Sequence, residues 1–366
     1  MVRSRVLPAL LAVLVTASPL RAQAADPGYR VGVVSESGDI VTWLRPGDGT
    51  LVVDHVVPVG IMPADIDGPH NVTVAPDGKS YYISIAHGTP YGSLWRLSLP
   101  GDTLIGRAPL ELFPTTISVT PDGEIAFVAN SDFYGDRPRT NFISVIHTPT
   151  MTKIADVAAC DMPHGVKVNH GGTRVYVTCM HSDEILEMDP GTFGISRRAR
   201  TGSGHEMAGM TATAHAGPVC APTFVSVSPD DKRLYVACNT GNTLQVWDAG
   251  SLTRIREIPV GHGAYNVEAS PDGKLVIVTN KKDRSVSILD AGSLAELARV
   301  PTSKPVVHGV AYSPDGRYAY ISSESVGADP GAVDMIDLGT RKVVVSVPVP
   351  LQPTGITIWR RQGAGE

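Results

Sequence analysis

The sequence predicts an all-β fold, a seven-bladed β-propeller of four-stranded antiparallel blades. A short apolar strand repeatedly leads through a tight turn into a second strand, at intervals of about 40 to 50 residues, which is typical of propellers. Turns must be frequent, because Gly 37 and Pro 29 among 366 residues exceed the average usage of about 12%. The repeated turns are Pro76-Asp77-Gly78, Pro121-Asp122-Gly123, His170-Gly171-Gly172, Pro229-Asp230-Asp231, Pro271-Asp272-Gly273 and Pro314-Asp315-Gly316.

The N-terminus reads as an export signal. Arg3 and Arg5 precede an apolar run over residues 6–20, and small residues at 22–24 suit a signal peptidase. We therefore expect residues 1–24 to be a signal peptide and residues 25–366 to form a single propeller domain in the periplasm or outside the cell. The alternative is an uncleaved anchor. No later apolar stretch approaches the roughly 18 residues of a membrane span, so we expect no span after signal removal.

Four strands make up each full repeat. An inner strand precedes the turn, and a second, a third and an outer strand follow it, as in the segments 234–238, 244–248 and 255–260. The first segment, 30–60, holds only the last three strands, and residues 354–359 supply only an inner strand. The C-terminal strand is therefore expected to join the N-terminal blade, which closes a ring of seven blades and leaves no open sheet edge around it.

The repeat consensus resembles the YVTN-type β-propeller family of exported and surface-layer proteins. The resemblance covers nearly the whole mature chain and rests on the segments 174–179 (RVYVTC), 233–239 (RLYVACN), 243–248 (TLQVWD), 285–290 (SVSILD) and 332–337 (AVDMID). It implies the propeller fold. Relatives such as the nitrous oxide reductase, haem d1 and lactonase propellers do different jobs on this scaffold, so function must be argued from the site.

Composition and motifs exclude several functions. The net charge is −5 with 18% charged residues and no basic stripe, so nucleic acid is not an expected partner. The chain has no haem attachment motif (C-x-x-C-H), no nucleotide-binding motif and no nucleophile elbow.

Histidines recur at the predicted channel mouth. The residue six places before each turn, or its equivalent, forms a ring there: His70, Thr115, His164, Thr223, Tyr265, His308 and Thr354. We number the blade that both ends of the chain share as blade 1. His70, His164 and His308 then come from blades 2, 4 and 7, which is the nearest to three-fold spacing that seven blades allow. Three converging imidazoles suit copper, zinc or iron. The alternative is that these histidines are polar residues wetted by the channel.

A second position of the repeat also carries histidines, in two of the blades. His87 and His181 stand eleven places after the turn position, in the loop between the second and third strands of blades 2 and 4. They are candidate auxiliary metal ligands or catalytic proton donors.

An insert over residues 201–222 interrupts the repeat and is predicted to cover the channel mouth as a lid. His205, Met207, Met210 and His215 are its candidate ligands, and thioether sulfur favours copper. Glu206 is a candidate proton acceptor. A plain surface loop is the alternative.

Four cysteines in an exported chain favour disulfides. Separations of 19 and 18 residues place the partners opposite each other in two neighbouring hairpins. This symmetry favours Cys160–Cys179 and Cys220–Cys238, with thiolate ligation of the metal as the rival.

Three functions follow from these observations. The first is a metal site at the channel mouth, in a metal-dependent enzyme acting on a small molecule or in a metal carrier. The second is a non-catalytic scaffold that binds a periplasmic or surface protein. The third is a lactonase-like hydrolase, for which Asp65, Asp67, Asp132 and Glu324 lie near the mouth without a common register.

Overall fold

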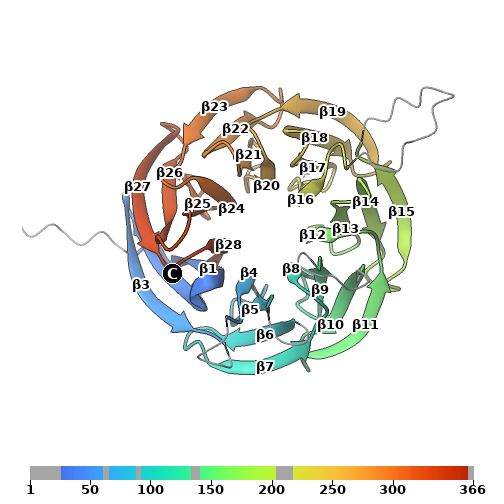
Figure 1. Cartoon of the computed structure of the whole chain (residues 1–366), viewed down its shortest axis with the longest axis horizontal. Coiled ribbons are helices and arrows are strands. Elements are labelled where there is room, and N and C mark those ends of the chain that lie inside the picture. Colours follow the sequence, from blue (N-terminus) through green and yellow to red (C-terminus); the bar gives the residue numbers. More distant parts are fainter. Residues whose placement is uncertain (1–25, 61–65, 88–91, 133–140, 203–216, 362–366) are drawn as a thin grey trace, which may run out of the picture.

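A computed structural model of the chain shows seven four-stranded antiparallel sheets arranged as blades of a ring (Figure 1). It describes residues 26–60, 66–87, 92–132, 141–202 and 217–361. The predicted signal peptide and the candidate lid residues His205, Glu206, Met207, Met210 and His215 lie outside these ranges. Within these ranges, no helix has the length and apolar character needed to cross a membrane.

Each blade contributes four strands that run from the channel outward. The inner strands are β4 (Pro69–Val74), β8 (Pro114–Val119), β12 (Pro163–Val168), β16 (Pro222–Val227), β20 (Ala264–Ala269), β24 (Val306–Tyr312) and β28 (Pro353–Arg360). The second strands are β1 (Tyr29–Ser35), β5 (Ser80–Ile85), β9 (Ile125–Asn130), β13 (Val175–Cys179), β17 (Arg233–Cys238), β21 (Leu275–Asn280) and β25 (Tyr318–Glu324). The third strands are β2 (Ile40–Gly47), β6 (Ser93–Ser98), β10 (Phe142–His147), β14 (Glu184–Met188), β18 (Thr243–Asp248), β22 (Ser285–Asp290) and β26 (Gly331–Asp337). The outer strands are β3 (Thr50–Pro58), β7 (Leu104–Pro109), β11 (Thr152–Ala158), β15 (Ile195–Arg200), β19 (Thr253–Pro259), β23 (Glu296–Pro301) and β27 (Lys342–Val349). A short 3-10 helix, η1 (Glu36–Gly38), follows β1.

The two ends of the chain share blade 1, as the sequence predicted. Strand β28 pairs antiparallel with β1, from Arg360 opposite Tyr29 to Pro353 opposite Ser35. The sheet order is β28-β1-β2-β3, so a C-terminal strand completes an N-terminal sheet. Main-chain hydrogen bonds therefore close the ring.

The turns after the inner strands explain why the Pro-Asp-Gly pattern repeats. Gly78 has a φ of +67°, a left-handed conformation that glycine adopts without steric cost. The aspartate before it accepts a hydrogen bond from the backbone two residues on, as Asp272 does from Lys274 N at 3.1 Å. Asp231 takes the glycine place in blade 5 at a φ of +57°, which aspartate tolerates better than most residues.

The hydrophobic core is divided among the interfaces between blades. Among the described residues, each of seven apolar clusters joins two neighbouring blades. At the closing interface Trp43 packs edge-on against Tyr81 and Trp359, with ring centroids 5.3 and 5.7 Å apart. Outer strands such as β11 alternate between exposed and part-buried residues, whereas second strands such as β5 are buried on both faces. Side chains available for chemistry are therefore those at strand ends and in the channel.

The two expected disulfides are confirmed. Cys160 is bonded to Cys179, and Cys220 to Cys238. Both bonds lie within blades 4 and 5, and no cysteine is left as a thiol. The rival expectation, thiolate ligation of a metal, is wrong because all four sulfurs are paired.

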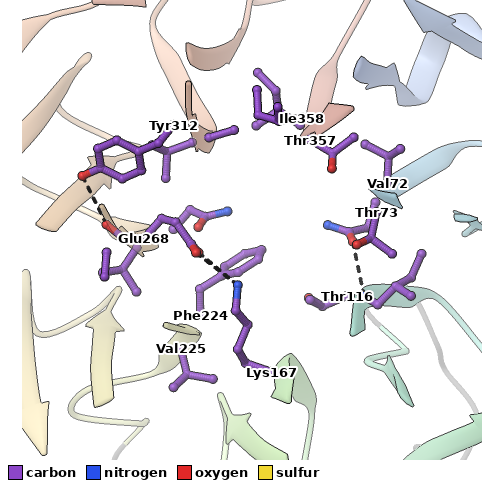
Figure 2. Close-up of a pocket in the computed structure, with 18 of the residues that line it drawn as sticks. Val72, Thr73, Thr116, Lys167, Phe224, Val225, Glu268, Tyr312, Thr357 and Ile358 are labelled. Atoms are coloured by element: carbon purple, nitrogen blue, oxygen red, sulfur yellow. Dashed lines mark hydrogen bonds and ion pairs between the residues drawn. The ribbon is translucent and has the colours of Figure 1, made fainter. Parts of the chain in front are cut away.

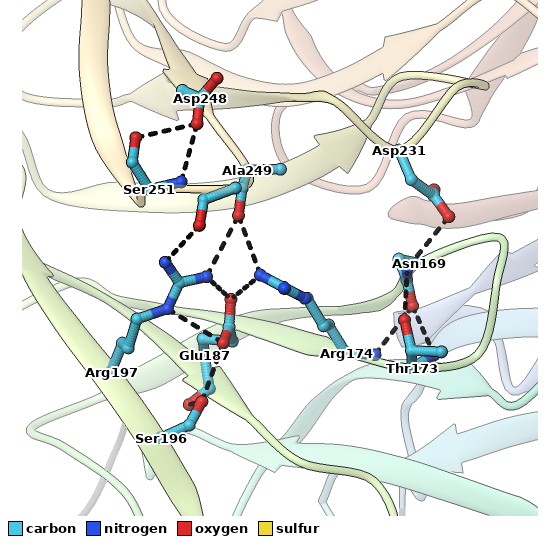
Figure 3. Close-up of polar contacts among 11 residues, drawn as sticks. Asn169, Thr173, Arg174, Glu187, Ser196, Arg197, Asp231, Asp248, Ala249 and Ser251 are labelled. Atoms are coloured by element: carbon cyan, nitrogen blue, oxygen red, sulfur yellow. Dashed lines mark hydrogen bonds and ion pairs between the residues drawn. The ribbon is translucent and has the colours of Figure 1, made fainter.

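Arginines also tie blade 4 to blade 5 (Figure 3). Arg174 donates to Glu187 at 3.0 Å and to the Ala249 carbonyl of the next blade at 3.1 Å. Arg197 also pairs with Glu187 and donates to the carbonyls of Ala249 and Gly250. Glu187 thereby orients two guanidinium groups toward the neighbouring blade.

Candidate functional site

Seven ring residues, one at or near the start of each inner strand, lie at one mouth of the channel. Threonine occupies this position in blades 1, 3 and 5, and histidine or tyrosine occupies it in blades 2, 4, 6 and 7. The ring residues, in blade order, are Thr354, His70, Thr115, His164, Thr223, Tyr265 and His308. All seven are buried.

The ring threonines point sideways and link the blades. Thr354 Oγ1 donates to the His70 carbonyl at 2.7 Å, and Thr115 Oγ1 donates to the His164 carbonyl at 2.9 Å. Thr223 Oγ1 likewise donates to the Tyr265 carbonyl at 2.5 Å. Each threonine thus fixes the backbone of the aromatic ring residue in the next blade, so three imidazoles and one phenol are left to shape the mouth.

His164 is neutral, and both its ring nitrogens are engaged. Burial, together with the charge of His70, lowers its pKa from 6.5 to about 3. Its Nδ1 lies 2.9 Å from the Thr223 carbonyl, which can only accept, so Nδ1 carries the proton. Nε2 is then an acceptor and takes a hydrogen bond from the Tyr265 hydroxyl at 3.1 Å. As arranged, His164 orients Tyr265 and offers no nitrogen to a metal.

His70 is held by a carboxylate that the sequence analysis did not single out. Its Nδ1 lies 2.5 Å from Glu36 Oε2, and the other oxygen of Glu36 lies 2.7 Å from His87 Nε2. Burial alone would raise the pKa of Glu36, but His70 and His87 outweigh it and lower that pKa to about 2. Glu36 is therefore an anion at neutral pH, and it fixes the orientation of both imidazoles.

Two imidazole nitrogens remain without partners. His70 Nε2 and His308 Nδ1 are buried and have no hydrogen-bond partner among the described residues. The two rings come from blades 2 and 7 and lie 5.5 Å apart between centroids, nearly perpendicular. Burial, with the charge of Lys281, lowers the pKa of His308 well below 6.5, so this ring is neutral. A buried nitrogen without a hydrogen-bond partner is costly, and binding of an ion is one arrangement that would satisfy both nitrogens.

A cavity of about 250 Å³ adjoins these rings. Lys281 stands in its wall with Nζ 4.2 Å above the Tyr265 ring and 3.4 Å from Glu324 Oε1. Burial raises the pKa of Glu324 and the negative Glu36 raises it further, although Lys281 opposes both effects. The residues around the cavity are Glu36, His70, Phe113, Met180, Asn239, Tyr265, Lys281, Lys282, His308, Glu324, Gln352 and Thr354.

The structure brings only part of the sequence-predicted site together. His70 and His308 meet, and His87 joins them through Glu36. His181 is one-third exposed, lies 3.9 Å from Asp161 and does not line the cavity. In the part of the chain that the structure describes, no group of three or more His, Cys, Asp or Glu residues could hold a metal ion.

Glu36 and Lys281 were missed, although the sequence held a signal for both. They follow the second strands of blades 1 and 6, in the same loop that carries His87 and His181. They lie one place earlier in this loop than His87 and His181, so the eleven-place spacing does not align them with these histidines. Blade 1 also lacks the turn from which the positions were counted, so the place of Glu36 in the register was hidden.

Comparison with protein families gives a partial match. The model of the cytochrome D1 heme domain family matches residues 275–359, which is less than half of the chain. No curated protein sequence matches the chain.

Solved structures share the fold. Hydrazine synthase of Kuenenia stuttgartiensis is 22% identical over 81% of this chain and 93% of its own, with a TM-score of 0.65. A candidate 6-phosphogluconolactonase of Bacteroides fragilis is 14% identical over 91% of this chain and 98% of its own, with a TM-score of 0.70. Dihydro-heme d1 dehydrogenase NirN, in complex with DHE, is 16% identical over 94% of this chain and 78% of its own, with a TM-score of 0.57. At these identities the likeness shows the fold alone, and it confirms the expected YVTN-like seven-bladed propeller.

Proposed function

We propose that this protein binds a transition-metal ion at the channel mouth, between His70 Nε2 and His308 Nδ1. The observation that carries the proposal is the pair of buried imidazole nitrogens, in rings 5.5 Å apart, for which the described part of the chain supplies no hydrogen-bond partner. Neutral imidazole is a donor for copper, zinc and iron, and His308 is held neutral by burial.

Glu36 supports this role for His70. Metal-ligating histidines almost always donate their other ring N–H to a carboxylate or carbonyl, which fixes the tautomer and raises the basicity of the ligating nitrogen. The contact between His70 Nδ1 and Glu36 Oε2 at 2.5 Å supplies this arrangement. Because a second histidine, His87, also anchors Glu36, the carboxylate keeps its place.

Two protein donors leave coordination positions for other ligands. The cavity of about 250 Å³ beside the two rings gives a small molecule room to approach, which favours a metal-dependent reaction over a closed carrier site. A bound ion would act there as a Lewis acid on that molecule. The lid residues His205, Met207, Met210 and His215 remain predicted further ligands.

The cavity is small for a tetrapyrrole. Drug-sized ligands occupy about 300–1,000 Å³, and the cavity that the described residues form is smaller. His164, the third ring histidine, has both nitrogens engaged and cannot serve as an axial ligand as it stands. The proposal is therefore a mononuclear ion and a small ligand, without haem.

We also propose that the protein works in the periplasm or outside the cell. Two disulfides support this location, because such bonds persist in oxidising compartments. The predicted signal peptide, residues 1–24, is consistent with it.

Elemental analysis of the protein purified from its native compartment tests the function. We expect about one ion per chain in the wild type, and most of the metal content to be lost in His70→Ala and in His308→Ala. His181→Ala is the matched control, because this histidine is one-third exposed, lies outside the cavity and should leave the metal content unchanged. Metal-free native protein, or full occupancy in both ring variants, would refute the proposal.

A further inference from the structure

A second cavity, of about 300 Å³, lies further along the channel than the ring residues. Its walls come from all seven inner strands, at positions one to four places after the ring position, and from Pro271 in the turn after β20. It shares no residue with the cavity at the histidines. Figure 2 shows Lys167, Glu268 and Phe224 reaching into the space between the inner strands.

One cation and one anion stand in this cavity. Lys167 on β12 and Glu268 on β20 are its charged lining residues, and Lys167 Nζ lies 3.1 and 3.3 Å from the two oxygens of Glu268 (Figure 2). The pair spans blades 4 and 6, because β16 of blade 5 lies between their strands. Both side chains are 32% exposed, so the pair remains in contact with water.

The pair is not needed to hold the blades together. Partly exposed ion pairs add little to stability, since solvent screens them and both side chains lose freedom. Inter-blade packing and the hydrogen bonds of the ring threonines already join these blades. The pair is therefore available to a ligand, in a cavity whose other lining residues are uncharged.

The balance of charge selects the class of ligand. A singly charged ligand would pair with Lys167 or Glu268 and leave the other without its partner, so it would only exchange one ion pair for another. A zwitterion can satisfy both, with its carboxylate on Lys167 and its ammonium on Glu268. Uncharged polar side chains, Thr73, Thr357 and Asn266, also line the cavity and can bind the remaining polar atoms.

We propose that this channel cavity, lined by Lys167 and Glu268, is a binding site for a small zwitterion of amino-acid size. A ligand of this size fits a cavity of about 300 Å³ together with bridging waters. The site does not depend on the metal proposed at the mouth.

Isothermal titration at constant ionic strength tests the site with glycine, β-alanine and γ-aminobutyrate, whose charges are spaced differently. Acetate and methylammonium are the singly charged comparisons. We expect saturable binding of at least one zwitterion, at least tenfold tighter than either comparison. Lys167→Met and Glu268→Gln should each weaken it at least tenfold.

Three further variants keep the result interpretable. Lys153→Met alters an ion pair between Lys153 and Asp156 of blade 3, away from the cavity, and should bind as the wild type does. The double exchange Lys167→Glu with Glu268→Lys preserves a pair of opposite charges and should retain binding even if the single variants fold poorly. His70→Ala, which alters the proposed metal site, should also retain zwitterion binding. The proposal is overturned if no zwitterion binds, if acetate binds equally tightly, or if both single variants bind as the wild type does.

Discussion

At the residue scale, the three ring histidines occupy equivalent positions in their blades but differ in how their ring nitrogens are hydrogen-bonded. His164 is neutral and bonded at both nitrogens, His70 is fixed at one nitrogen by a carboxylate, and His308 is neutral with Nδ1 unpaired. Their spacing in the sequence predicted equivalent roles. The neighbours that distinguish them, Thr223 and Glu36, come from other blades, and spacing along the chain carries no information about these contacts.

Glu36 gives the sharpest test at this scale. Glu36→Gln removes the charge that orients His70, so we expect metal affinity to fall about 10- to 100-fold while the fold is retained. Competition with a chelator of known affinity measures the change. The matched control is Glu124→Gln, because Glu124 is exposed and lies 3.7 Å from His147 on the surface. Unchanged affinity in Glu36→Gln would show that this carboxylate does not support a ligand.

At the element scale, the sequence predicted the strands well. The expected segments 234–238 and 244–248 begin one residue after β17 and β18, and 354–359 is one residue shorter than β28 at each end. The expected outer segment 255–260 begins two residues after β19 and ends one residue beyond it. The Pro-Asp-Gly turns set the register, because each needs a left-handed residue at a fixed place. The cysteine pairs followed from that register. The sideways direction of the ring threonines could not be predicted, since it depends on carbonyls of the next blade.

The contact between blades 4 and 5 gives a prediction on stability. Glu187 is buried and orients Arg174 and Arg197, so Glu187→Gln should lower the free energy of unfolding by about 1–3 kcal/mol. Glu296→Gln, in a more exposed pair with Arg299, should cost less than about 1 kcal/mol. Urea unfolding at pH 7 measures both. Equal effects would show that Glu187 contributes no more than a surface pair.

Glu187 should also make part of the free energy of unfolding depend on pH. Burial raises the pKa of Glu187, but Arg197, Ser196 and Arg174 outweigh it, so its pKa in the folded protein lies below the ordinary 4.5. The unfolded state therefore binds the proton more readily. The stability difference between wild type and Glu187→Gln should be complete above pH 4.5 and should shrink as the pH falls below it. A difference that stayed constant down to pH 3 would contradict this origin.

At the scale of the whole molecule, the closing strand makes the ring depend on both ends of the chain. A chain that ends at Pro350 lacks β28, which exposes the edge of β1 and removes Trp359 from its packing on Trp43. We expect this chain to lose its near-ultraviolet circular dichroism and to associate through the exposed edge. A chain shortened only by residues 362–366 is the control. A monomeric, native-like chain ending at Pro350 would show that blade 1 does not need its inner strand.

An odd number of blades has a consequence for where chemistry can occur. Threonine alternates with histidine or tyrosine from one ring position to the next. Strict alternation is impossible around a ring of seven positions, because seven is odd. One mismatch is unavoidable, and it puts Tyr265 and His308 in direct succession, with ring centroids 4.6 Å apart. The odd number of blades therefore breaks the alternation between blades 6 and 7, where two aromatic side chains adjoin with no threonine between them.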